Sequence, residues 1–377
     1  MLYLDNAATT LRKPLPVYLS MMYNTMFNSV NAGHGGHLYS VRGAKKVYET
    51  AETLAWLLKI SNPERIAFTH NATYALNMGI RGLVGEGDHV VTTSMEHNSV
   101  LRTLNGLCDY SMAQADADGF VPPERIRELI RPETKLIVVN HISNVCGTIQ
   151  DIKEIGRIAR EHNITFMADA AQSIGNVPID VDDMGIDMLA FSAHKGLMGP
   201  LGVGVLYVSE KIRLKAIITG GTGSDSKNLN QPEVMPDMLQ SGTINTPAVI
   251  ACKSAAEYLM GRGVCEIGEN ENKLAVRFIE NIKNMGKVKV YGKTGREGRN
   301  GTVAFNIEGM DSVETAQRLN DEFKICVRGG WHCAYPAHQS LNTGENGAVR
   351  ASFGMFDTLH SVDKLTDAVY EIVKGCK

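Results

Sequence analysis

The sequence predicts an α/β fold in which a mainly parallel sheet is covered by helices, followed by a smaller α+β domain. Through the middle of the chain, short apolar runs rich in β-branched residues alternate with segments of helical periodicity. This alternation is typical of parallel sheets, because parallel strands are joined by helical crossovers. Residues 220–240 are rich in Gly, Ser, Asn and Pro and interrupt the alternation, as expected of a long functional loop or an interface segment.

The expected elements follow one another in a regular order. Before the loop we expect strands at residues 66–69, 89–92, 136–140, 164–168, 188–191 and 202–208, and helices that begin near Ala72 and Asn98 or cover residues 151–162. After the loop we expect a helix at residues 247–260 and strands at residues 288–291, 302–307 and 325–327, with further helices between them.

The composition excludes several classes of protein. Of the 377 residues, 44% are apolar and 21% are charged, so the chain can bury a large core. The 38 basic and 41 acidic side chains give a net charge of −3, which argues against a nucleic acid partner. No segment approaches the ~20 apolar residues of a membrane span, and residues 1–5 do not resemble a secretory signal. We therefore expect a cytoplasmic protein without a membrane partner.

The cysteines predict neither a disulfide framework nor a metal site. Seven cysteines are scattered along the chain, without a CxxC pair or a paired Cys/His spacing. In a reducing compartment most free cysteines are small buried side chains. A cysteine with a function must therefore be recognised from its neighbours.

Polar side chains follow the expected strands, where ligands gather in open α/β sheets. Asp169 and Lys195 come directly after two consecutive strands, and His97 and Asn144 follow two others. Thr73 lies at the start of an expected helix, where free N–H groups favour a phosphate. Each of these residues alone is more often structural. Together, a lysine for a Schiff base, an acid for a pyridinium nitrogen, an aromatic ring and a phosphate site indicate pyridoxal phosphate.

Longer motifs occur in a colinear order from residue 4 to about residue 355. They are LDNAAT at 4–9, SMEH at 94–97, HISNV at 141–145, DAAQ at 169–172, FSAHK at 191–195, SGT at 241–243, RGGWHCA at 328–334 and VRAS at 349–352. In this order they resemble the class V aminotransferase family, and within it the cysteine desulfurases.

The resemblance implies a homodimeric enzyme of fold type I that depends on pyridoxal phosphate. The residues expected to hold the cofactor are Ala72, Thr73, His97, Asn144, Asp169, Gln172, Ser192, His194, Lys195 and, from the partner subunit, Thr243. Lys195 would bind the cofactor covalently, Asp169 would pair with its ring nitrogen and Gln172 with its ring hydroxyl. His97 would stack on the ring and assist proton transfer. Ala72 stands where the family often has a second hydroxyl before Thr73.

The same resemblance divides the chain into two domains. A large cofactor-binding domain would cover residues 15–258. A small domain, formed by residues 1–14 and 259–377, would carry the catalytic cysteine and the arginine for the substrate carboxylate. Arg350, whose planar guanidinium matches a carboxylate, would bind that group together with Asn144 and Arg328.

Cys333 distinguishes desulfuration from transamination. Desulfuration needs a thiolate that attacks the sulfur of the substrate, whereas an aminotransferase needs no thiol. Cys333 follows a Gly-Gly turn and is expected in a loop, where functional residues are common. Arg328 and His332 are close enough in sequence to act on its pKa. The RxGxHCA form resembles the second group of desulfurases, which includes enzymes similar to selenocysteine lyases.

Several alternatives remain open from the sequence. Trp331 stands where the family commonly has His, and the roles of His34 and His37 are undetermined. The expected activity is conversion of L-cysteine to L-alanine, with the sulfur passed to Cys333 as a persulfide and then to an acceptor protein. Selenocysteine lyase is the alternative within the family. A second hypothesis is a C–S β-lyase, epimerase or aminotransferase, which release of pyruvate would favour. A third is a non-catalytic partner protein, which failure to bind the cofactor would favour.

Overall fold

The computed structural model describes residues 1–33, 35–224 and 227–375 and is built around a seven-stranded sheet. In spatial order its strands are β2 (Ile66–Thr69), β8 (Gly204–Val208), β7 (Met188–Ser192), β6 (Thr165–Asp169), β5 (Thr134–Asn140), β3 (His89–Thr93) and β4 (Asp109–Ala113). β8 alone runs opposite to the other six strands, so its pairings with β2 and β7 are antiparallel and the remaining pairings are parallel. The sheet is therefore mainly parallel, as the sequence predicts.

The two faces of this sheet are buried by different residues of the same strands. Val138 and Met167 pack on one side, whereas Val139 and Phe166 pack on the other. This alternation follows from the two-residue period of a strand. Because helices cover both faces, the strands are continuously apolar.

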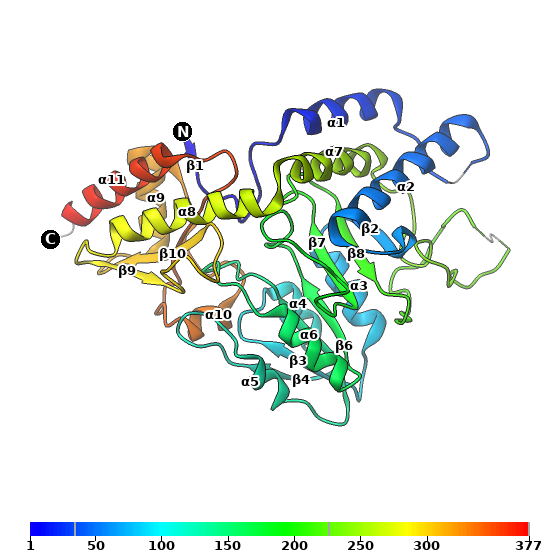
Figure 1. The fold of residues 1–377 in the computed structure, drawn as a ribbon, viewed down its shortest axis with the longest axis horizontal. Helices are drawn as coiled ribbons and strands as arrows, with labels where there is room; N and C mark the ends of the chain where they lie inside the picture. Colours follow the sequence, from blue (N-terminus) through cyan, green and yellow to red (C-terminus); the bar gives the residue numbers. More distant parts are fainter. Residues whose placement is uncertain (34, 225–226, 376–377) are drawn as a thin grey trace.

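The covering helices form two layers, which Figure 1 shows on either side of the sheet. They are α1 (Leu15–Phe27), α2 (Leu38–Leu58), α3 (Ala72–Leu83), α4 (Asn98–Leu104), α5 (Pro123–Arg127), α6 (Ile152–Glu161) and α7 (Thr246–Arg262), with a short 3-10 helix at Pro63–Arg65. α1 and α2 both pack against α7. The sequence pattern did not predict α1, α2, α5 or the edge strand β4.

A second core lies around a smaller antiparallel sheet at the other end of the molecule (Figure 1). Its strands are β12 (Val349–Ser352), β10 (Thr302–Ile307) and β9 (Val288–Tyr291), and its helices are α8 (Val264–Ile282), α9 (Ser312–Phe323) and α11 (Leu359–Gly375). The N-terminal β1 (Leu2–Tyr3) joins this end by pairing with β11 (Ile325–Cys326). A short helix, α10 (Tyr335–Ser340), follows the cysteine motif.

The expected elements agree with the observed ones, with small shifts at their ends. The strand expected from residue 202 begins at Gly204, and the helix expected at 247–260 is α7. The expected domain boundary after residue 258 falls inside α7, whose last residue is Arg262, so the proposed division stays a prediction. Among the residues that the structure describes, no helix combines the length and the apolar character needed to cross a membrane.

Candidate active site

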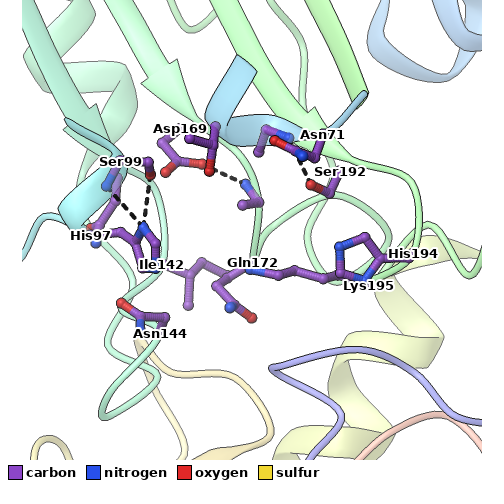
Figure 2. A pocket seen from close by; sticks show the side chains of 14 residues that line it. Asn71, His97, Ser99, Ile142, Asn144, Asp169, Gln172, Ser192, His194 and Lys195 are labelled. Carbon is purple, nitrogen blue, oxygen red and sulfur yellow. Dashed lines mark hydrogen bonds between the residues drawn. The ribbon is translucent and has the colours of Figure 1, made fainter. Parts of the chain in front are cut away.

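A cavity of about 230 Å³ opens at the carboxyl ends of the parallel strands. The predicted residues that line it are Ala72, Thr73, His97, Asn144, Asp169, Gln172, Ser192, His194 and Lys195. Strand register explains the gathering, because Asn140 ends β5 directly beside Asp169, the last residue of β6. Figure 2 shows Lys195 extending across the cavity between His97 and His194.

Asp169 and Lys195 lie on segments whose backbones touch. A side chain at Gly175 or Gly196 would collide with the other segment, so glycine permits this close approach. Oδ1 of Asp169 accepts the N–H of Ala171 at 2.9 Å, which fixes the carboxylate. Burial lowers the pKa of Lys195 to about 8, opposed by the charge of Asp169. A lysine with this pKa is partly neutral near neutral pH and can accept a proton.

The start of α3 provides an anion site. Asn71 caps the helix through its side chain, and the N–H of Ala72 donates to Oγ of Ser192 at 2.8 Å. Because Ser192 accepts in this bond, its own hydroxyl hydrogen remains available to a ligand. No described hydrogen bond uses the N–H of Thr73. The free N–H and the helix dipole therefore face the cavity together.

His97 is the N-terminal cap of α4 and is held in one tautomer. Its Nδ1 accepts the N–H of Ser99 at 3.1 Å, so the ring proton lies on Nε2. Burial, together with the charges of Lys195 and Arg328, lowers the pKa of His97 to about 4. The ring is therefore neutral at neutral pH, which suits a group that stacks on an aromatic ligand.

Arg350 connects the second core to this cavity. It is 2% exposed, pairs with Asp5 at 2.7 Å and donates from Nη1 to the carbonyl of Asn144 at 2.9 Å. Its Nε is buried and has no partner among the described residues. Arg328, which pairs with Arg350 through the backbone, is exposed. Its charge lowers the pKa of both His97 and Lys195, so it also lies near the cavity.

Cys333 lies in a loop that meets the edge of the cavity, and its side chain is exposed. Its carbonyl accepts the N–H of Asn98, next to His97, at 2.7 Å. His332 is buried, and burial lowers its pKa well below the usual range. His332 is therefore neutral and faces the interior, where its ring nitrogens lie against His338 and the carbonyl of Arg328.

The family-model match decides the relationship. The model of the family described as "Aminotransferase class-V" matches residues 2–365. The chain belongs to this family.

Three relatives of this class V chain are named cysteine desulfurases. A probable cysteine desulfurase from Methanothermobacter thermautotrophicus is 35% identical, over 98% of this chain and 94% of the relative. Another from Pyrococcus abyssi is 33% identical, over 100% of this chain and 95% of the relative. The apo structure of a cysteine desulfurase from Thermococcus onnurineus superposes with a TM-score of 0.91 at 33% identity, covering 99% and 95% of the two chains.

In this class V chain the predicted residue Thr243 lies away from the cavity, and so does His37, whose role the sequence left open. Thr243 is exposed and lines a separate cavity of about 80 Å³. His37 caps α2, with Nδ1 accepting the N–H of Ser40, which is a structural role. His34 lies outside the described residues.

Several residues that shape the site have no role predicted from the sequence. Asp5 pairs with Arg350, Asn71 caps the start of α3, and Ser99 donates its backbone N–H to the His97 cap of α4. The N-cap pattern at Asn71 was a usable signal. Glu96 had no such signal. It is buried with Oε1 accepting the N–H of Asn140 at 3.0 Å, so it ties together two strand ends, and burial raises its pKa to about 8.

Proposed function

We propose that the protein is a pyridoxal phosphate-dependent cysteine desulfurase, which converts L-cysteine to L-alanine and keeps the sulfur as a persulfide on Cys333. The observation that carries this proposal is an exposed thiol at the edge of a cavity that contains a lysine of lowered pKa and a buried aspartate. The names of the relatives support the same activity.

The residues fit the cofactor. The anion site at Thr73, Ser192 and His194 suits its phosphate, and Asp169 suits its ring nitrogen. Oδ1 of Asn140 and Oδ1 of Asn144 are buried in the cavity wall without partners among the described residues. Buried polar atoms are normally satisfied, so these atoms support a polar ligand at this place. When bound, pyridoxal phosphate supplies an electron sink for the bonds that break at the substrate Cα and Cβ.

The side chains have separate roles in the proposed reaction. Nζ of Lys195, in its neutral form, removes the proton from the substrate Cα and later returns a proton. Sγ of Cys333 attacks the substrate sulfur, so an S–S bond forms as the C–S bond breaks. Neutral His97 packs against the cofactor ring. In each turnover, one cysteine and one enzyme thiol are converted to one alanine and one enzyme persulfide.

Residues of the second core would bind the substrate carboxylate. Nε of Arg350 is an unpartnered buried donor, and a carboxylate would satisfy it. Asn144 and Arg328 lie close enough to assist. In this proposal residues 15–258 hold the cofactor, and residues 1–14 and 259–377 bring the carboxylate site and the thiol to it. The exposed thiol is then open to a sulfur-acceptor protein.

Product analysis tests the activity. The purified protein is incubated with L-cysteine and, separately, with L-selenocysteine, and alanine and pyruvate are quantified. The peptide that contains Cys333 is weighed under non-reducing conditions. We expect alanine and a gain of one sulfur atom on Cys333. Alanine from selenocysteine alone would assign a selenocysteine lyase, and pyruvate would assign a C–S β-lyase; either result contradicts the proposal.

We further propose a homodimer in which the apolar face of α1 meets a second copy of the chain and Thr243 of each subunit approaches the phosphate site of the other. The exposed side chains of this face recur at helical spacing and are Leu15, Tyr18, Leu19, Met22, Tyr23, Met26 and Phe27. An exposed apolar stripe of this size marks an interaction site. The exposed position of Thr243, outside the cavity of its own chain, agrees with this arrangement.

The dimer can be tested by charging this face. We expect Leu19→Asp combined with Met22→Asp to change the mass in light scattering from two chains to one and to reduce cofactor occupancy. Leu359→Asp, at an exposed leucine on α11, is the matched control and should change neither value. A double variant that retains the mass of two chains would refute the proposed interface.

A further inference from the structure

The backbone at Cys333 is held in a conformation that it would rarely adopt alone. His332 and Cys333 have φ values of 48° and 58°, in the left-handed region. Neither residue is glycine, so Cβ sterics disfavour this conformation at both positions. Such backbone persists only where surrounding contacts hold it.

Two contacts hold the backbone of these residues from the side of the large sheet. The N–H of Asn98 donates to the carbonyl of Cys333 at 2.7 Å. Nδ2 of Asn144 donates to the carbonyl of His332 at 2.8 Å. Both donors lie beside the cavity, so these bonds fix how far the thiol stands from it.

A chain of hydrogen bonds holds the loop from the other side, and each proton in it can be assigned. Nε2 of His332 lies 3.2 Å from the carbonyl of Arg328, which only accepts, so Nε2 carries the proton. Nδ1 of His332 must then accept from Nε2 of His338, at 3.2 Å. Nδ1 of His338 accepts in turn from the hydroxyl of Thr343, at 3.0 Å. The chain has one consistent direction, from Thr343 to Arg328.

The surroundings of His338 keep this chain intact. The ring is 1% exposed, stacks on His332 and meets the edge of Trp331. The carbonyl of Trp331 is a further acceptor for it. Burial lowers the pKa of His338 to about 4, so the ring is neutral at neutral pH, as the proton assignment requires. Loss of its donor would leave the buried Nδ1 of His332 unpaired.

We propose that His338 is a positioning residue for Cys333. It acts through His332 and is oriented by Thr343, and it holds the thiol where it can reach the substrate sulfur. This inference rests on the proposed function, because it assigns His338 a role only if Cys333 accepts the sulfur. His338 does not line the cavity. It therefore acts on the thiol only through its neighbours in the loop.

A matched pair of variants isolates the hydrogen bond. His338→Gln keeps an N–H donor near the position of Nε2, whereas His338→Met has a similar size and no donor. We expect His338→Met to lower kcat for alanine formation by roughly 10²-fold, the scale of a misplacement of about 1 Å. KM for cysteine and cofactor occupancy should stay at the wild-type values, because Arg350 and Lys195 are unaffected. His338→Gln should recover most of the loss.

A second readout needs no turnover. Amide hydrogen exchange of residues 328–340 and of Asn98 should become faster in His338→Met than in His338→Gln, because the loop is released. Thr343→Val, which removes only the hydroxyl, should change exchange in the same direction to a smaller extent. Equal exchange and equal kcat in the Met and Gln variants would overturn the proposal. Absence of persulfide on Cys333 in the wild-type protein would instead overturn the proposed function.

Discussion

Replacing Cys333 by alanine is expected to reduce alanine formation from L-cysteine by roughly 10³-fold or more, the scale seen when a nucleophile is removed. Without the thiol, none of the described residues that line the cavity offers a thiol to accept the sulfur. Activity on L-selenocysteine should persist in part, because the C–Se bond is weaker and selenide leaves more readily. The measurement is the rate of alanine release from each substrate, with cofactor occupancy determined in parallel.

The chain provides a matched control for this variant. Cys265 is also exposed and free, but it lies on α8, away from the cavity. Cys265→Ala should retain the full rate on both substrates. If Cys333→Ala bound the cofactor normally and lost both activities equally, the proposed role of the thiol as sulfur acceptor would be contradicted.

Lys195→Ala is expected to abolish turnover of both substrates. Loss of the proton-transfer group alone costs about 10²–10⁴-fold, and loss of covalent attachment adds to this. Lys195→Arg should be equally inactive, because a guanidinium stays protonated at any working pH and cannot accept the Cα proton. The check is the rate of alanine release, together with the mass of the Lys195 peptide after borohydride reduction, which should carry the cofactor only in the wild type.

Lys153 provides the matched control, because it is a lysine of the same chain that does not line the cavity. It forms an exposed ion pair with Asp183, which contributes little to stability. Lys153→Ala should keep the wild-type rate and the reduced-cofactor adduct on Lys195. Measurable turnover by Lys195→Ala would remove the lysine from its proposed role as base.

The local pattern of the sequence was sufficient to predict six of the seven strands of the central sheet, all but the edge strand β4, and the residues at their ends. The apolar β-branched runs that became β5, β6 and β7 could be read directly, because each strand is buried on both faces. Asp169 and Lys195 could then be placed at one edge, since the carboxyl ends of parallel strands meet there. Helix α1 was not predicted because its apolar side chains face solvent as well as the interior, which weakens its amphipathic pattern.

The sequence by itself predicted the alternation of strands and helices from β2 to α7, apart from β4 and α5, and the positions of Thr73, Asp169 and Lys195 at the ends of these elements. These features depend on periodicity and on residues that are neighbours in the chain. Only the tertiary structure decided that Asp5 pairs with Arg350 across 345 positions, and that Asn98 holds the carbonyl of Cys333. It also decided that His332 turns inward to His338 and stays neutral. The physical reason is that burial and hydrogen-bond partners depend on how distant segments pack, which no local pattern encodes.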